Sequence, residues 1–276
     1  MEYTIQSWRK PNPHRPNFVN ATPDEYPATR FFDNLSFIGD RGTACFLLET
    51  SAGLVLIDCL WPNERCVDII ERGIRDLGRD PADLKAIVLT HGHGDHYGRC
   101  GVFKRKYGCR VYISQTDLAL AKTGFAGFDP IDCEVDGFIE DGVPLRFGDT
   151  EILPVFTPGH TDGCMSFVFP VTDEGRSHTA SLWGGTGLLP TSDPNVYVES
   201  LHKFRRICDE HGADVEISNH PFVDNLIERL EVVRHIVDGV ANPFVIGMEA
   251  RHRYEDMFLH IAEEAIRTGK RADLGR

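Results

Sequence analysis

Four potential metal ligands lie within six residues of this chain, directly after an apolar run at residues 85–90. They belong to the segment Thr-His-Gly-His-Gly-Asp-His and are His91, His93, Asp95 and His96. A helix would scatter these side chains because of its 3.6-residue period, whereas a loop containing Gly92 and Gly94 can bend until all four converge. The segment therefore predicts a buried strand that ends at a metal-binding loop. Its spacing disfavours the alternative, a solvated histidine-rich loop.

The ligand types favour zinc. Neutral imidazole and carboxylate are groups that zinc binds, and three protein ligands with one open position are the arrangement of catalytic sites. The same groups also accept iron, manganese or cobalt. The motif thus predicts a catalytic metal site and leaves the metal itself open.

The rest of the chain alternates short β-like runs with amphipathic segments. Strands are predicted at residues 35–38, 44–49, 54–57, 85–90, 110–113, 151–156, 164–168 and 215–218. Helices are predicted from Asn63, the expected N-cap, to residue 77, and at residues 199–211, 222–237 and 248–268. This alternation suits an α/β fold with two sheets between helices, although periodicity alone leaves other layered α/β folds open.

The domain organisation is predicted to be simple. Residues 1–30 are rich in proline and asparagine and predict an extended N-terminal arm. Residues 31–276 are then long enough for one domain with a full core. The oligomeric state is not predicted.

Charge and hydropathy restrict the partners. A net charge of −13 disfavours nucleic acid and anionic membranes, so we expect a small-molecule substrate. No window of 18 uninterrupted apolar residues occurs. The N-terminus shows no apolar signal segment, so we expect a cytoplasmic protein if Met1 is the natural start. The eight cysteines form no C-x-x-C pair and are expected to be buried small hydrophobes.

The spacing His91-x-His93-x-Asp95-His96 resembles the H-x-H-x-D-H motif of the metallo-β-lactamase superfamily, and the resemblance extends from about Asp33 to Phe244. It implies a four-layer αββα sandwich. In the family, Asp58, at the end of the strand that precedes the motif, steadies the metal loop. The segment Thr-Pro-Gly-His-Thr is similar to the next ligand motif and implies that His160 binds the first metal. On its own, a histidine after Pro-Gly is typical of a turn.

The remaining ligands indicate a subgroup. Most hydrolases of the superfamily have an aspartate that bridges both metals, whereas this chain has Gly185 there. The third subclass of zinc β-lactamases also lacks this carboxylate and uses a late histidine instead, which His220 resembles. Further similarity to that subclass lies at residues 33–39, 80–87 and 241–244.

The resemblance implies a dinuclear zinc hydrolase. His91, His93 and His160 would hold one Zn²⁺, and Asp95, His96 and His220 would hold the other. A metal-bound hydroxide would attack the carbonyl of a cyclic amide, ester or related substrate, with Asp95 orienting it. We expect replacement of His160 or His220 to abolish turnover.

The substrate is predicted only as a class. Trp61, Tyr97, Phe125 and Thr186 are candidate pocket residues, and the first three are equally often plain core. Third-subclass β-lactamases commonly use serine hydroxyls in this loop to hold the drug's carboxylate. These are missing here, which disfavours efficient β-lactam binding, and Thr186, Thr191 or Ser192 are the candidates to replace them. A lactonase or thioesterase of the same fold is the main alternative. A one-iron persulfide dioxygenase is disfavoured by Gly185, a non-catalytic protein by the complete ligand set, and a nuclease by the charge.

Overall fold

The computed structural model describes residues 25–124, 127–237 and 239–269. Within them, one sheet has the strand order β1 to β7: Glu25–Phe32, Leu35–Asp40, Ala44–Thr50, Gly53–Ile57, Leu84–Val88, Arg110–Ile113 and Gly137–Phe138. The other sheet has the order β12-β11-β10-β9-β8: Val215–Ser218, Arg176–Trp183, Met165–Asp173, Thr150–Phe156 and Leu145–Phe147. The helices are α2 Glu64–Asp76, η1 Pro81–Asp83, α3 Gly94–Tyr97, α4 Cys100–Tyr107, α5 Gln115–Ala121, α6 Pro194–Glu210, α7 Leu226–Arg234 and α8 Gly247–Thr268.

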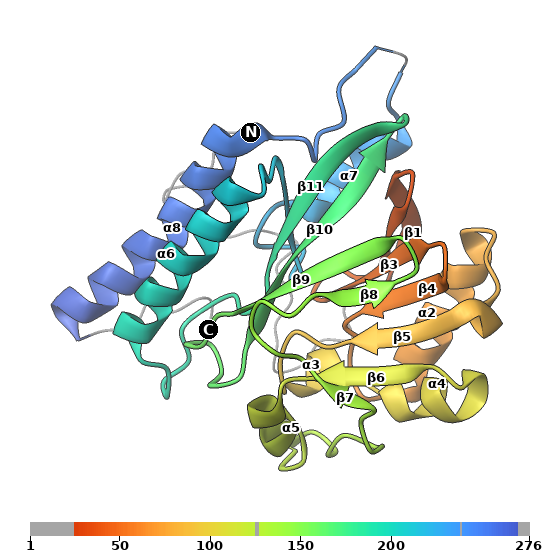
Figure 1. Ribbon diagram of the computed structural model, residues 1–276, viewed down its shortest axis with the longest axis horizontal. Helices are drawn as coiled ribbons and strands as arrows, with labels where there is room; N and C mark the ends of the chain where they lie inside the picture. Colours follow the sequence, from red (N-terminus) through yellow and green to blue (C-terminus); the bar gives the residue numbers. More distant parts are fainter. Residues whose placement is uncertain (1–24, 125–126, 238, 270–276) are drawn as a thin grey trace.

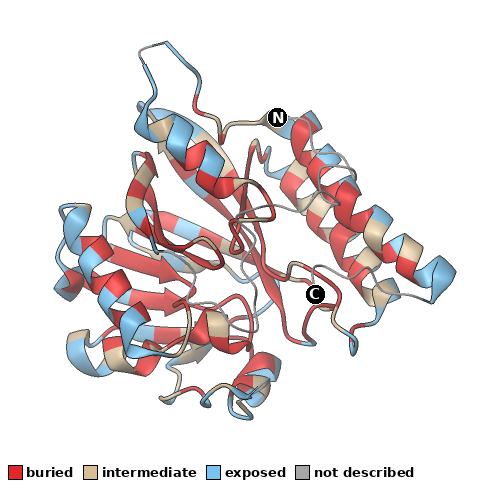
Figure 2. Ribbon diagram, turned by 180° about the vertical axis from the view of Figure 1, so that it is seen from behind, coloured by how far each residue is buried: buried red, intermediate tan, exposed pale blue. Residues whose placement is uncertain are grey.

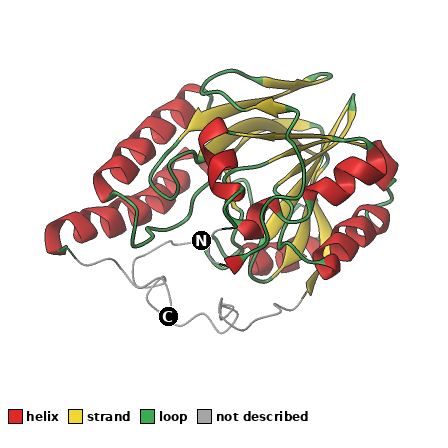
Figure 3. Cartoon of the chain, turned by 90° about the horizontal axis from the view of Figure 1, so that it is seen from below, coloured by secondary structure: helices red, strands yellow, loops and turns green. Residues whose placement is uncertain are grey.

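The two sheets lie face to face between helices, as Figures 1 and 3 show. Helices α6 and α8 lie side by side over the smaller sheet, while α2 and α4 cover the larger one. The prediction of a four-layer αββα sandwich is therefore confirmed.

Side chains alternate between the two faces of each strand, so the buried apolar residues gather in three cores. In β3, Phe46 and Leu48 point between the sheets, and Cys45 and Leu47 point toward the helices. Because successive side chains of a strand face opposite sides, a sheet covered on both faces needs a continuous apolar strand. Figure 2 shows these strands as buried and the outer faces of the helices as exposed. This is why the apolar runs read from the sequence become central strands.

The predicted helix after Pro62-Asn63 is confirmed as α2. Asn63 caps it by accepting a hydrogen bond from Cys66 N at 2.9 Å, and its apolar stripe is buried. Of the predicted strands, 85–90 forms β5 over Leu84–Val88. Its neighbours β4 and β6 run parallel to it.

The metal motif is not wholly a loop. Its last ligands lie in the single helical turn α3, which is closed by hydrogen bonds from the N–H groups of His96 and Tyr97 to the carbonyl of His93. The prediction of a loop was wrong for this half. The turn still allows convergence because the first two ligands lie outside it.

The domain boundaries stay a prediction. Residues 1–24 lie outside the described residues, while residues 25–32, partly included in the predicted arm, form β1 of the larger sheet. Among the described helices, none is both long and apolar enough to cross a membrane.

Candidate metal centre

The candidate ligands follow strands of both sheets. Parallel strands β4 and β5 lead to Asp58 and to the metal motif, and parallel strands β11 and β12 lead to Gly185 and His220. Hydrogen bonds from Met165 N to Thr90 O, 2.9 Å, and from Ala44 N to Asn219 O, 2.9 Å, join the sheets here. Since parallel strands end at the same edge, segments far apart in sequence meet at one place.

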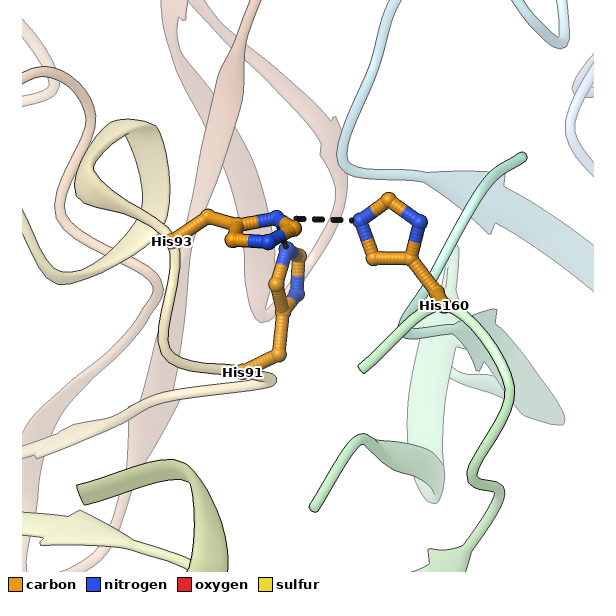
Figure 4. A group of neighbouring side chains, drawn as sticks. All are labelled: His91, His93 and His160. Atoms are coloured by element: carbon orange, nitrogen blue, oxygen red, sulfur yellow. Dashed lines mark hydrogen bonds between the residues drawn. The ribbon is translucent and has the colours of Figure 1, made fainter. Parts of the chain in front are cut away.

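The first ligand group consists of His91, His93 and His160, all buried (Figure 4). Nδ1 of His93 lies 3.1 Å from Nε2 of His91 and 3.1 Å from Nε2 of His160. Three ring nitrogens from two separate segments thus point at one another.

Hydrogen bonds behind the rings define their tautomers. His160 Nδ1 lies 2.8 Å from the carbonyl oxygen of Gly187, which only accepts, so this nitrogen donates. The Thr90 hydroxyl donates to the Asp58 carboxylate and therefore accepts from Nδ1 of His91 at 3.0 Å. Both Nε2 atoms then carry lone pairs directed at His93. A proton on His93 Nδ1 could be donated to only one of these two lone pairs at a time, whereas a metal cation accepts the lone pairs of all three rings.

The second ligand group consists of Asp95, His96 and His220, whose ligand atoms lie within 4.8 Å of one another. His96 Nδ1 donates to Asp58 Oδ2 at 2.8 Å, and His220 Nδ1 donates to the carbonyl of Gly42 at 2.9 Å. Each ring therefore directs its Nε2 lone pair to the site. In the described part of the chain, Nε2 of His96 is buried without a hydrogen-bond partner. Nitrogen and carboxylate ligands in two groups of three suit two zinc ions.

The electrostatics favour the protonation states that metal binding needs. Burial lowers the pKa of His93 to about 4 and lowers the pKa values of His91 and His160 well below the usual value. Burial alone would raise the pKa of Asp95, but the facing histidines His96, His220 and His93 outweigh burial and lower it. The first group is thus neutral and Asp95 is ionised at neutral pH.

His96 differs from the other ligands. Burial opposes its charged form, but the carboxylates of Asp95 and Asp58 outweigh burial and raise its pKa. The pKa of His220 is lowered, mainly by burial. The second group therefore contains His96, the histidine at which a proton competes most strongly with a metal ion.

Two supporting residues were missed in the sequence. Asp117, on α5, accepts hydrogen bonds from Gly92 N at 2.7 Å, Gly163 N at 2.8 Å and Thr161 Oγ1 at 2.6 Å. It thereby ties the first half of the metal motif to the loop of His160. Ser114, three residues earlier, is the N-cap of α5, so the sequence there indicates only a helix start.

The other missed residue is Asn219, which directly precedes His220. Its side-chain N–H groups reach Asp58 Oδ2 at 3.2 Å and the carbonyl of Gly184 at 3.0 Å. Adjacency to a ligand was the signal available in the sequence. Asp58 accepts hydrogen bonds from Thr90 N and from His96 Nδ1, at 2.8 Å each.

Gly185 packs directly against a ligand. A Cβ at this position would lie 2.4 Å from Cβ of His160 and 2.9 Å from Sγ of Cys164, closer than atoms can approach. A bridging carboxylate therefore cannot be placed at residue 185 unless the His160 loop moves.

The predicted pocket residues lie in different environments. Trp61 is partly buried and packs on Phe128, with ring centroids 5.6 Å apart. Thr186 is partly buried, and within the described chain its enclosed hydroxyl has no hydrogen-bond partner. Tyr97 is not a pocket wall, because it is fully buried in the core and donates to the Asp129 carbonyl. Phe125 lies outside the described residues.

Comparison with known sequences finds relatives among hydrolases. Residues 38–172 match the family model described as "Metallo-beta-lactamase superfamily". An N-acyl homoserine lactonase AttM from Agrobacterium fabrum is 29% identical over 187 residues, 60% of this chain and 69% of that protein. A hydroxyacylglutathione hydrolase from Rhodopseudomonas palustris is 32% identical over 54% of this chain and 56% of its own. The exodeoxyribonuclease WalJ from Streptococcus pneumoniae is 32% identical over 41% of this chain and 40% of its own.

Solved structures resemble the whole fold. The metallo-β-lactamase FEZ-1 from Legionella gormanii superposes with a TM-score of 0.79 at 22% identity, covering 91% of this chain and 100% of that one. BJP-1 from Bradyrhizobium japonicum, of subclass B3, gives 0.74 at 23% identity, covering 88% and 94%. At these identities the likeness establishes the architecture.

Proposed function

Because this chain belongs to the metallo-β-lactamase superfamily and is a metal-dependent hydrolase, we propose that it is a two-zinc enzyme that hydrolyses a cyclic amide, ester or related carbonyl compound. The first ligand group would hold one zinc ion and the second ligand group the other. The observation that carries the proposal is the presence of two groups of three candidate ligands, next to a glycine, Gly185, that has no room for a bridging side chain. This ligand pattern is the one that the sequence shares with third-subclass β-lactamases.

The residues around the zinc ions would have different roles. When bound, zinc acts as a Lewis acid and lowers the pKa of water to about 7. Asp95 is ionised, and the carboxylate oxygen not turned toward His96 can accept a hydrogen bond from the attacking hydroxide and orient it. Asp58 holds the rings of His91 and His96 in the tautomers that bind metal.

The loop at residues 184–187 supports a compact, weakly polar subsite. Its three glycines place little side-chain bulk beside His160, and Thr186 is its single hydroxyl. A serine-lined carboxylate subsite, as in third-subclass β-lactamases, is thus reduced to one threonine. A lactone, or a thioester, fits this loop as well as a β-lactam does, and the likeness to a lactonase and a thioester hydrolase favours these as the second candidates.

The other candidates have less support. A one-iron dioxygenase would rely on a carboxylate at residue 185, which His160 excludes. A nuclease would have to bind a polyanion with a chain of net charge −13.

We further propose that the enzyme acts on a small molecule in the cytoplasm.

The first test is hydrolysis of a chromogenic cephalosporin by zinc-loaded protein, with chelated protein as the control. Chelator-sensitive turnover with kcat/KM near or above about 10⁴ M⁻¹s⁻¹ would make β-lactams its substrates. Much slower turnover would direct the search to an acyl-homoserine lactone and an S-acyl thioester, assayed in parallel.

Two variants test the metal assignment itself. We expect His220→Ala to retain about one zinc per chain and His160→Ala to lose the first-group zinc, each with loss of turnover. His202→Ala, on the exposed face of α6, is the matched control. Two tightly bound zinc ions in either ligand variant would overturn the assignment.

A further inference from the structure

A pair of thiols lies outside the metal centre. Cys100 begins α4 and is fully buried, whereas Cys133 is partly exposed in the segment that leads to β7. Their Sγ atoms are 3.7 Å apart, although the residues are 33 positions apart in the chain. The contact therefore joins the helix that follows the metal motif to a distant loop.

Hydrogen bonds to the residues just before Cys133 hold this loop against the helices. The hydroxyl of Tyr97 donates to the carbonyl of Asp129 at 2.6 Å, and Gly101 N donates to Asp132 Oδ1 at 2.7 Å. The guanidinium of Arg105 also donates to the backbone carbonyl and to the carboxylate of Asp132, at 2.9 Å each. These contacts keep the two sulfur atoms facing each other.

The two thiols have different environments. The contact with Cys133 and burial raise the pKa of Cys100, which packs in the apolar core beneath α4. The hydrogen bond from Cys100 lowers the pKa of Cys133, and the cations of Lys104 and Arg105 act in the same direction. A partly exposed thiol with a lowered pKa beside a buried thiol is the arrangement of reactive and resolving cysteines.

A metal site is the alternative, because Cys100, Asp132 and Cys133 also lie close enough to share an ion. The carboxylate of Asp132, however, already accepts from Gly101 and Arg105, and Arg99 Nε lies 3.7 Å from it. Guanidinium groups on the only carboxylate ligand would repel a metal ion. The surroundings thus favour thiol chemistry.

We propose that Cys100 and Cys133 form a reversible redox pair that a hydroperoxide oxidises to a disulfide. The Cys133 thiolate attacks a peroxide oxygen, so that an S–O bond forms, the O–O bond breaks and the leaving hydroxide takes a proton to become water. Cys100, losing its proton to solvent, then attacks the Cys133 sulfur, and the S–O bond breaks to release a second water. Two thiols are oxidised by two electrons, and hydrogen peroxide is reduced to two water molecules.

The geometry allows the second step with a local movement. The sulfur atoms must approach from 3.7 Å to about 2.0 Å. Cys133 lies outside regular secondary structure, between α5 and β7, so the loop can supply this shift. Because the disulfide would cross-link the start of α4 to that loop, we expect the oxidised protein to have a higher Tm.

The experiment treats the full zinc-loaded chain with hydrogen peroxide, alkylates the remaining thiols and maps the peptides without reduction. We expect loss of two of the eight alkylatable thiols, a cross-linked peptide pair containing residues 100 and 133, and reversal by dithiothreitol. In Cys100→Ser, oxidation should stop at a Cys133 sulfenic acid that a dimedone probe traps. In Cys133→Ser, the remaining thiols, including Cys100, should stay reduced after peroxide treatment. Cys208 is a buried residue of α6 that packs with α8 on the other side of the sheets, and Cys208→Ser should behave like the wild type.

Three results would overturn the proposal. One is full alkylation of Cys133 after oxidation, and another is a disulfide between other cysteines. The third is a zinc ion lost specifically on Cys133→Ser, because this would identify the cluster as a metal site.

Discussion

The carboxylate of Asp58 lies 2.8 Å from Nδ1 of His96, and both side chains are buried. The same carboxylate accepts from the hydroxyl of Thr90, whose oxygen accepts in turn from His91. One buried group therefore sets the tautomer of a ligand in each of the two groups.

The variant Asp58→Asn tests this role. The backbone N–H of Thr90 donates to Oδ1 of Asp58, and Nδ1 of His96 donates to Oδ2. An amide has one accepting oxygen in place of two, so these two donors can no longer both be satisfied. We expect zinc affinity to fall by about 10- to 100-fold, mainly in the second ligand group. Competition with a chromophoric chelator measures it, and Asp162→Asn, at an exposed position, is the control. Unchanged affinity would show that the tautomers are set otherwise.

Removal of Asp117 should destabilise the fold around the first ligand group. Asp117→Ala leaves the buried N–H groups of Gly92 and Gly163 unpaired, at about 1–3 kcal/mol each. We expect the free energy of unfolding to fall by about 2–5 kcal/mol in urea titrations, with lower zinc occupancy in the first group. Asp162→Ala should change neither value by much, and an equally stable Asp117→Ala protein would contradict the assignment.

The variant Gly185→Asp should not provide a functional bridging carboxylate. Its Cβ would overlap His160, so Gly185→Asp must displace a ligand of the first group. We expect loss of zinc and turnover. Gly185→Ala carries the same Cβ without the charge, so equal defects in both variants would establish a steric cause. An active Gly185→Asp enzyme with two tightly held metals would be the contrary outcome.

Acid should remove the zinc of the second ligand group first. The pKa of His96 is raised above its usual value, so this ring takes up a proton at higher pH than its neighbours, while the pKa of His93 is about 4. A protonated imidazole has no lone pair for a metal. As pH falls from about 7 to about 4, we expect metal content after dialysis to pass through a plateau near one zinc per chain. Simultaneous release of both ions, or first release from the first group, would be inconsistent with this order.

Several features were predictable because they are local. The apolar runs predicted β3, β4 and β5, and Asn63 marked the start of α2 because a cap contacts its own next turn. The strand β11 was missed, since its first half, from Arg176, is polar and partly exposed. Its position is set by pairing with β10 and β12 across distant parts of the chain.

The sequence by itself determined the ligand types, the position of the metal motif at the end of a buried strand, and a glycine where a carboxylate would bridge the metals. The first two properties depend on residue chemistry and short spacing, and the meaning of the glycine comes from the resemblance to the superfamily. Only the tertiary structure decided that Asp117 joins two metal loops and that Cys100 faces Cys133. Such contacts depend on how the sheets and helices pack, and spacing along the chain carries no information on which distant side chains then meet.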